Sequence, residues 1–461
     1  MKAAAPSARA EPLDELIGQL PPDTVLTDPD VVEGYRMDRS NARSAGRPRA
    51  VARVSCTAEV QTVLRWASAQ RVPVVTRGAG TGLSGGSVAV DGCLTVSTER
   101  MRRVEVDVPG RRVVAQPGAL NVEVKEAARA HGLWYPPDPS SFEICSIGGN
   151  VATNAGGLCC VKYGVTTDYV LGLEVVLADG RLLRLGGRTI KDVAGYDLKR
   201  LFTGSEGTLG VITEVTLRLR TPPPAPTTMV AMFAGVEEAG HAVSTIAAAG
   251  NPAVLELMDR TSVRAVDQQF HMELGDCGAL LLGQSDAGGE RGAAEVETMI
   301  AACREAGAEE VYSTADPDQG AQLMTARRMA IPAVERMGTV LIEDVGVPLG
   351  QVAQLITGVE RVADRRATVI ATIGHAGDGN FHPLVVFDRH DAGAVGRAER
   401  AFGEVMELAL ALGGTITGEH GVGTLKRPWL EEQLGADVLA VMGDVKRALD
   451  PLGILNPGKA L

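Results

Sequence analysis

The sequence is poor in aromatic residues and in basic charge, and each shortage argues against a class of partner. Phe, Trp and Tyr make up only 3% of the 461 residues, too few for the stacking platforms that bind single-stranded nucleic acid. The 45 Lys and Arg are outnumbered by 57 Asp and Glu, which gives a formal net charge of -12. Because neutralising phosphates requires a basic surface, no nucleic acid is expected as a partner.

The cysteines show no disulfide or metal-binding pattern, and the apolar segments show no membrane span or signal peptide. The seven cysteines include no C-x-x-C pair, so the sequence encodes neither a zinc ribbon nor an iron–sulfur ligand set. Their odd number and wide spacing do not indicate a disulfide framework. No segment offers about 18 uninterrupted apolar residues, and residues 1–20 lack the apolar core of a signal peptide. We therefore expect a cytoplasmic protein, with attachment to a membrane through a partner left open.

A proline-dense stretch, Thr221–Pro226 (TPPPAP), is predicted to be a linker because it cannot continue a strand. Before it, short β-type runs alternate with helical patterns around glycine-rich loops. After it, longer helical patterns alternate with strands, of which residues 338–347 and 367–374 give the best signals. The alternation predicts an α+β fold in both halves.

Three glycine-rich loops in the first half indicate a large cofactor that carries phosphate. The first, Arg77–Gly86 (RGAGTGLSGG), follows a β-type run, so its backbone N–H groups can approach an anion closely. It contains the dinucleotide pattern G-x-G-x-x-G, but the next residues are poor helix formers, which argues against a Rossmann unit. The others are residues 146–157 and 204–210. The alternative is that all three are ordinary tight turns.

Three of the seven histidines lie in two motifs typical of a metal site. In Gly374–His382 (GHAGDGNFH), a Gly-Asp-Gly turn between two β-type runs should bring His375 and His382 together. Convergent imidazoles favour a divalent ion such as Zn²⁺. The motif Gly418–Gly423 (GEHGVG) offers a third ligand; consecutive extended residues point apart, so Glu419 and His420 should serve different tasks. The alternative is a hydrogen-bonded hairpin without an ion.

The glycine loops resemble the FAD-binding domain of the vanillyl-alcohol oxidase and p-cresol methylhydroxylase (PCMH) family over about residues 49–219. The resemblance implies a PCMH-type FAD-binding domain at 49–221, preceded by an N-terminal helical extension at 1–48. Some members attach the flavin through a His in or near the first loop, which has none here, so non-covalent FAD is expected. The residues that the resemblance assigns to FAD are Arg77, Gly78, Ala79, Gly80, Thr81, Gly82, Leu83, Ser84, Pro137, Asp138, Ser146, Gly148, Gly149, Asn150, Thr153, Asn154, Gly156, Gly157, Glu206, Gly207, Gly210, Val211, Ile212 and Asn456.

Residues 227–461 resemble the C-terminal domain of glycolate oxidase flavin subunits, D-lactate dehydrogenases and D-2-hydroxyglutarate dehydrogenases. The matching segments are 375–382, 418–426 (GEHGVGTLK) and 449–459 (LDPLGILNPGK). The resemblance implies an α+β substrate and cap domain of the FAD-linked oxidase type. It assigns a divalent ion, Zn²⁺ or alternatively Mn²⁺, to His375, His382 and Glu419, and it makes His420 the catalytic base.

The same resemblance predicts the oxidation of a small 2-hydroxy acid to the 2-oxo acid. Arg327, in Thr325–Pro332 (TARRMAIP), matches an Arg that binds the substrate carboxylate, and Arg328 is its rival. D-2-hydroxyglutarate dehydrogenases carry a Lys at or near Ile342 and an Asn where this chain has Leu384. These departures favour glycolate or D-lactate over a dicarboxylate.

The electron acceptor and several alternatives stay open at this point. Because the chain has no iron–sulfur ligand set, electrons must leave FAD for oxygen, a quinone, a cytochrome or an iron–sulfur partner subunit, in a homodimer or a hetero-oligomer. The alternatives are a non-catalytic flavin subunit of a larger glycolate oxidase, a D-2-hydroxyglutarate dehydrogenase, a flavin enzyme of non-redox group transfer, and a metallohydrolase without flavin.

Overall fold

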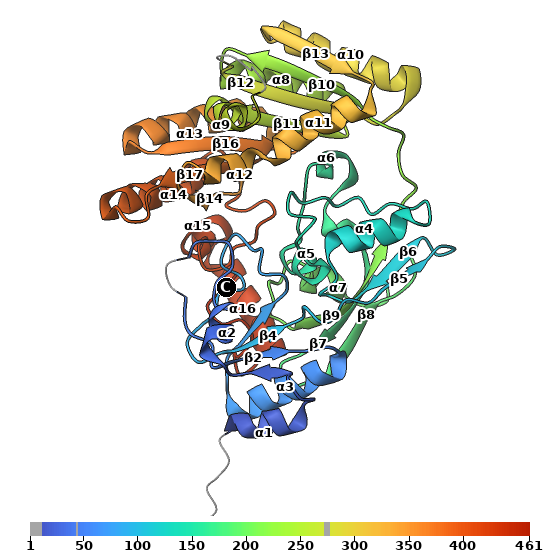
Figure 1. Ribbon diagram of the computed structural model, residues 1–461, viewed down its shortest axis with the longest axis vertical. Coiled ribbons are helices and arrows are strands. Elements are labelled where there is room, and N and C mark those ends of the chain that lie inside the picture. Colours follow the sequence, from blue (N-terminus) through green and yellow to red (C-terminus); the bar gives the residue numbers. More distant parts are fainter. Residues whose placement is uncertain (1–11, 43–44, 272–276) are drawn as a thin grey trace, which may run out of the picture.

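The computed structural model describes residues 12–42, 45–271 and 277–461, whose arrangement Figure 1 shows. Within these ranges the strands form three sheets, of four, five and eight strands. Helices and strands occur together in both halves, so the predicted α+β class is confirmed. No helix of the described residues is long and apolar enough to cross a bilayer. Residues 1–11 of the predicted N-terminal extension lie outside the described residues.

The half before the linker contains two sheets that share one apolar core with α3. In the smaller sheet, of order β1-β2-β4-β3, the last three strands run parallel, whereas the larger sheet, of order β5-β6-β9-β7-β8, is antiparallel. The strands are β1 Val25–Leu26, β2 Ala50–Arg53, β3 Val74–Arg77, β4 Leu94–Ser97, β5 Val104–Asp107, β6 Arg112–Ala115, β7 Val170–Val176, β8 Leu182–Gly186 and β9 Val211–Arg218. The helices are α1 Pro12–Gln19, α2 Pro29–Glu33, α3 Thr57–Gln70, α4 Asn121–Arg129, α5 Ile147–Thr153, α6 Cys160–Tyr163 and α7 Leu198–Phe202.

In the half after the linker, helices cover both faces of one antiparallel sheet. Its order is β13-β10-β12-β11-β16-β17-β14, and β15 also pairs with β17. The strands are β10 Thr227–Phe233, β11 Val254–Asp259, β12 Ala279–Ser285, β13 Glu310–Thr314, β14 Thr339–Ile342, β15 Val345–Gly346, β16 Val369–His375 and β17 Asn380–Phe387. One face packs against α8 Val236–Ala249, α10 Gly289–Glu305, α13 Val352–Arg366 and α14 Ala392–Ala411. The other packs against α9 Arg260–Phe270, α11 Pro317–Arg328 and α12 Ala330–Glu335.

The strand expected at residues 338–347 is broken in the structure. It divides into β14 and β15 at Glu343 and Asp344, although both parts pair with β17. The break lies opposite Pro383, whose carbonyl accepts a hydrogen bond of 2.9 Å from Glu343 N but which has no N–H to return. The interruption frees Asp344 from the ladder, and its side chain turns toward residues 417–420.

The end of the chain returns to the N-terminal half, where Val445 and Leu449 of α16 (Ala436–Leu449) pack against the core of the larger sheet. α15 (Leu430–Leu434) precedes it. The segment after α16 runs parallel to β3: Val74 N donates to Ile454 O at 2.8 Å, and Asn456 N donates to Val74 O at 2.7 Å. Ile454 and Leu455 are buried in the core of the smaller sheet. The first half is therefore built from both ends of the chain.

Replacing Leu455 with Ala tests this return of the chain. Leu455 is fully buried, so the substitution should lower the free energy of unfolding by about 2–5 kcal/mol, as for other buried Leu residues. Urea denaturation of the purified protein measures the change. The matched control is Leu452→Ala, because Leu452 is 45% exposed three residues away and should change stability little. Equal effects of the two variants would show that the segment does not pack into the core.

Candidate active site

The hairpin of β16 and β17 brings His375 and His382 onto one face of the sheet. His382 pairs with Ile373, and His375 follows two residues later on the same strand, so both imidazoles project from the same side. Asp378 N and Gly379 N donate to His375 O at 3.2 and 3.1 Å and close the turn. The two ring centroids lie 5.2 Å apart. The prediction that the Gly-Asp-Gly turn reverses the chain is confirmed.

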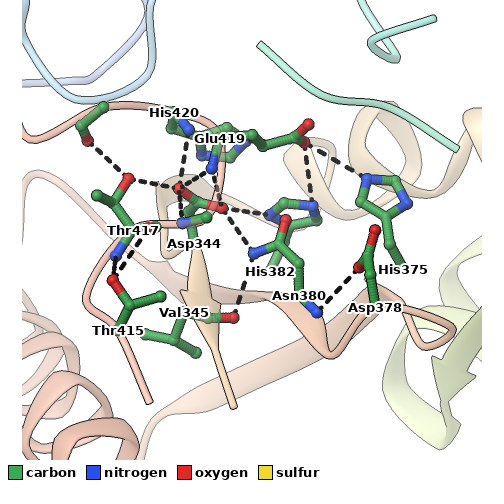
Figure 2. Close-up of polar contacts among 12 residues, drawn as sticks. Asp344, Val345, His375, Asp378, Asn380, His382, Thr415, Thr417, Glu419 and His420 are labelled. Atoms are coloured by element: carbon green, nitrogen blue, oxygen red, sulfur yellow. Dashed lines mark hydrogen bonds and ion pairs between the residues drawn. The ribbon is translucent and has the colours of Figure 1, made fainter. Parts of the chain in front are cut away.

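Three imidazoles converge on one oxygen of Glu419, as Figure 2 shows. Its Oε1 atom lies 3.4 Å from His375 Nε2 and 3.5 Å from His382 Nε2. His420 Nε2 is 3.7 Å from the same oxygen. The expectation that Glu419 and His420 point apart is therefore wrong, because residues 418–420 form a bend around Asp344 and not an extended strand.

These distances fit a tetrahedral ion. Ligand atoms held at about 2.0–2.2 Å from one ion in a tetrahedron lie roughly 3.3–3.6 Å apart, which matches the Glu419 distances to His375 and His382. The three residues offer ligand atoms that all lie within 4.8 Å of one another. Among the described residues, the side chain of Glu419 has no Lys or Arg as ion-pair partner, only imidazoles. A carboxylate with imidazoles is a donor set that suits a borderline divalent ion, and binding one here would require His375 to lose its Nε2 proton.

Burial and charge set the protonation of this cluster. Burial lowers the pKa of His375, but the Glu256 and Glu419 carboxylates together raise it by more. The net shift of the pKa is well upward, so a cation is stabilised on this ring. Burial, helped by His420, lowers the pKa of His382 to about 3, which keeps its imidazole neutral. Burial also lowers the pKa of His420. Burial raises the pKa of Glu419, but the His375 imidazole and its neighbours outweigh this and bring it to about 2.

Glu256 on β11 is a residue of the site that the sequence did not reveal. It lies directly opposite His375 in the sheet, and its Oε1 is 2.7 Å from His375 Nδ1. Its Oε2 forms an ion pair of 2.6 Å with Arg327 Nη2. A carboxylate on Nδ1 fixes the tautomer and leaves Nε2 directed at Glu419. The only sequence signal was a charged residue in the apolar run VLELMD, 119 positions before its partner.

Arg327 and Arg328, the two candidates for binding the substrate carboxylate, both line a cavity beside His382 and His420. They differ in burial and in their polar partners. Arg327 is 2% exposed, and its Nε and Nη2 have no hydrogen-bond partner because the ion pair with Glu256 lacks hydrogen-bond geometry. Arg328 is 34% exposed and lies 3.5 Å from Asp138. Arg327 therefore has two buried donor nitrogens without a hydrogen-bond partner, whereas Arg328 has one, its Nε, on a partly solvated side chain.

The glycine loops and the histidine cluster line one cavity of about 590 Å³, a size usual for small-molecule sites. His382, Glu419 and His420 form one part of its wall, together with Arg327. The residues assigned to FAD that line the same cavity are Gly78, Ala79, Gly80, Thr81, Gly82, Leu83, Ser84, Ser146, Gly148, Gly149, Asn150, Thr153, Glu206, Gly207, Gly210 and Ile212. Segments that are distant in sequence thus meet in a single space.

The other residues assigned to FAD lie outside that wall: Arg77, Pro137, Asp138, Asn154, Gly156, Gly157, Val211 and Asn456. Several support it from behind, as Asn456 does by donating from Nδ2 to Gly86 O at 2.9 Å. Gly156 and Gly157 instead line a second cavity of about 500 Å³, which His375 and Glu419 also border. A Cβ on Gly156 would lie 2.5 Å from Glu419 Oε2, so only glycine leaves room for that carboxylate.

Comparisons with known proteins agree with both halves of this structure. Residues 48–186 match a family model described as FAD binding domain, and residues 222–460 match one described as FAD linked oxidases, C-terminal domain. The glycolate oxidase subunit GlcD of Bacillus subtilis is 41% identical, with 89% of this chain and 88% of that protein covered. The D-lactate dehydrogenase of Archaeoglobus fulgidus is 35% identical, with 93% and 96% covered.

A solved structure shows the same fold at low identity. The structure of p-cresol methylhydroxylase with substrate bound superposes with a TM-score of 0.82 at 18% sequence identity, over 97% of this chain and 96% of that one. The predicted PCMH-type FAD-binding domain, followed by an FAD-linked oxidase C-terminal domain, is confirmed.

Replacing Gly78 with Ala tests the contact between the first two glycine loops. The new Cβ would overlap Ser146 Oγ, which accepts hydrogen bonds from Ala79 N and Gly149 N, both at 3.3 Å. Losing this cap should cost about 1 kcal/mol, which is roughly a fivefold weaker affinity for FAD. The flavin-to-protein absorbance ratio during dialysis measures it. Gly187→Ala is the control, because nothing lies within 4 Å of its Cβ position; equal flavin retention in both variants would contradict the assignment.

Proposed function

This chain belongs to the family of FAD-linked oxidases, and from that premise we propose that it oxidises a small 2-hydroxy monocarboxylic acid to the 2-oxo acid. Glycolate and D-lactate are the favoured substrates, since related proteins are named for acting on them. The observation that carries the proposal is the convergence of three imidazoles on Glu419, which together with His382 and His420 lines the cavity of the glycine loops. No other described part of the chain combines these elements.

The reaction removes a hydride from Cα of the substrate and a proton from its hydroxyl group. The loops at 77–86, 146–157 and 204–212 would hold FAD non-covalently, and the bound flavin would supply the hydride acceptor at N5. A divalent ion, Zn²⁺ or Mn²⁺, held by His375, His382 and Glu419, would lower the pKa of the substrate hydroxyl. The first loop brings no imidazole to the cavity, which supports non-covalent binding.

His420 is the proposed base that takes the hydroxyl proton. Its ring stacks on His382 with centroids 4.8 Å apart, which fixes its plane at the cavity wall. Burial lowers its pKa from the ordinary value near ~6.5, so at neutral pH the ring is uncharged and able to accept a proton. Its Nδ1 has no hydrogen-bond partner among the described residues. Among the described residues, Nδ1 therefore has no hydrogen-bonding group that competes for a proton at that atom, whereas Nε2 faces Glu419.

Arg327 is the proposed partner of the substrate carboxylate. The buried guanidinium lines the cavity and has two nitrogens without hydrogen-bond partners, as bidentate binding of a carboxylate requires. Glu256 forms an ion pair with Nη2 of this guanidinium and also contacts His375, so the proposed substrate-binding Arg and the proposed ion-binding His share one carboxylate. This arrangement would place the substrate hydroxyl near His420.

The wall between these groups favours a short substrate. Ile342 and Ile373 line the cavity beside His382, where a dicarboxylate substrate would need a cation such as the Lys of D-2-hydroxyglutarate dehydrogenases. Leu384, where those enzymes carry an Asn, is fully buried and pairs with Ile342 in the sheet. An apolar wall accommodates the hydrogen of glycolate or the methyl group of D-lactate without leaving a charge unpaired. D-2-hydroxyglutarate is the alternative.

The electron acceptor is proposed to be a quinone, a cytochrome or an iron–sulfur partner subunit. Support for a partner comes from the name of the Bacillus subtilis relative, which is a subunit of a glycolate oxidase. A purely structural flavin subunit would not require two imidazoles, a buried Arg and a carboxylate at the same cavity.

Anaerobic mixing with glycolate and with the D and L forms of lactate and 2-hydroxyglutarate tests the substrate class. One of the monocarboxylates should bleach the flavin absorbance, and prior treatment with a chelator should abolish the bleaching until Zn²⁺ or Mn²⁺ is added back. Bleaching by none of these acids would refute the proposed oxidation. Bleaching that survives complete metal removal would refute the role of the ion alone.

His420→Ala tests the base. The variant should retain FAD, but the rate of flavin reduction by the substrate should fall by roughly 10²–10⁴-fold, the usual cost of a lost general base. Stopped-flow absorbance measures this rate. The matched control is His390→Ala, because His390 is an exposed residue that follows β17. The flavin of this control variant should be reduced at the wild-type rate. A near-normal rate in the first variant would assign the proton to another group.

A further inference from the structure

The motif loop, residues 417–423, has its backbone held by two buried carboxylates that come from different halves of the molecule. On the basis of the proposed function, we propose that Asp344 and Glu206 are positioning residues. Asp344 holds Glu419 and His420 next to the hairpin that carries His375 and His382. Glu206 holds the same loop against the glycine loops. Neither residue touches the reacting atoms in this proposal. Their hydrogen bonds determine where the loop lies.

Asp344 accepts hydrogen bonds from most of the first half of the loop, as Figure 2 shows. Its Oδ2 accepts from Gly418 N at 2.9 Å, Glu419 N at 3.0 Å and His420 N at 2.8 Å. Three consecutive amides around one anion form a nest. Further donors are Thr417 Oγ1 at 2.7 Å, Asn380 Nδ2 at 2.9 Å and Lys426 Nζ at 3.2 Å. The carboxylate is fully buried, so these donors are its only described solvation.

Glu206 holds the second half of the loop from the flavin side. Its carboxylate accepts from Val422 N at 2.7 Å and from Gly423 N at 2.8 Å. Asn456 Nδ2 donates to Glu206 O at 2.6 Å and also to Gly86 O, which ties this residue to the first glycine loop. Glu206 is 7% exposed and has a left-handed backbone with φ of 50°. The loop therefore spans the two halves between two fixed anions.

The close approach of the loop to its neighbours explains the three glycines of GEHGVG. Gly421 has φ of 83°, and a Cβ there would lie 2.9 Å from Cδ of Glu206. Gly423 has φ of 53°, and a Cβ there would overlap Ser84 O in the first glycine loop. A Cβ on Gly418 would overlap the Asn380 side chain. Side chains at these positions would push the loop away from both carboxylates, so the motif is the sequence of a loop that wraps closely around anions.

Asp344 positions the loop and does not itself bind the ion. Asp344, His382 and His420 form a second group of potential metal ligands. A carboxylate offers about four lone-pair sites, and those of Asp344 are already used by six donors. The Lys426 ammonium, 3.2 Å from Oδ2, would also repel a cation bound there. Its contact with His382 Nδ1, at 3.7 Å, is too long for a hydrogen bond.

The neighbouring Glu343 supplies a matched control. It is fully buried like Asp344, but neither of its carboxylate oxygens has a hydrogen-bond partner among the described residues. Glu343→Gln therefore removes a carboxylate from the same strand break without removing a hydrogen bond to the loop. Asp344→Asn keeps the side-chain size but replaces one acceptor oxygen with an NH₂ group. The oxygen lost is either Oδ2, which accepts from five donors, or Oδ1, which accepts from Asn380 Nδ2 and Glu419 N.

Hydrogen exchange of the holoenzyme, with individual amides resolved, tests the hydrogen bonds that hold the loop without reference to the reaction. Asp344→Asn should speed exchange at residues 418–420 roughly tenfold or more, whereas Glu206→Gln should do so at 422–423. Glu343→Gln should leave both unchanged. Wild-type protection of 418–420 in Asp344→Asn, or an equal loss of protection in Glu343→Gln, would overturn the proposal.

Two further measurements distinguish a positioning residue from a general loss of stability. In Asp344→Asn the affinity for Co²⁺, titrated by its visible absorption, should fall about 10–100-fold, and kcat should fall while KM and FAD content stay within about twofold. If Asp344→Asn does not fold, Thr417→Val is the second variant, because it removes one of the side-chain donors to Asp344. Its Co²⁺ affinity and kcat should fall in the same way but by less. Wild-type values of both in Thr417→Val would overturn the proposal. Failure of the proposed oxidation would appear in the wild-type protein, as a flavin that no 2-hydroxy acid reduces, and leaves the exchange result interpretable.

Discussion

Two buried carboxylates need hydrogen-bond donors, and this requirement organises the contact between the two halves of the molecule. The backbone amides of the partly buried loop at 417–423 supply donors to both Asp344 and Glu206. Asp344 is available because Pro383 interrupts the ladder between β14 and β17. The interruption of one sheet thus provides the anion around which the motif loop, residues 417–423, folds.

Two of the carboxylates near the cluster are paired with cationic side chains, whereas Glu419 is not. Asp344 faces Lys426, and Glu256 faces Arg327. Glu419 faces only imidazoles within the described chain, and this is the carboxylate at the centre of the three Nε2 atoms. Because unpaired buried charge is costly, the arrangement is stable only if a cation, a proton or a metal ion, occupies that position.

The flavin half depends on the end of the chain as much as on its beginning. The segment at 454–456 extends the first sheet beside β3, and Asn456 joins the first and third glycine loops through Gly86 and Glu206. Asn456 was predicted to contact FAD, yet it lies behind the wall of the cavity and holds that wall in place. The cavity and the catalytic loop therefore share supports from segments hundreds of residues apart.

The sequence by itself determined the features that short-range patterns encode. The glycine loops, the hairpin at 375–382 and the motif at 418–423 each depend on residues within about ten positions, so turn chemistry and resemblance were enough to find them. Only the tertiary structure revealed Glu256 and Asp344. In the sequence Glu256 is a single carboxylate and Asp344 one of an adjacent pair, each within an apolar segment, and their partners are 119 and 76 positions away. It also decided that Glu419 and His420 turn to the same centre, because the bend of their loop is imposed by anions from other segments and not by its own sequence.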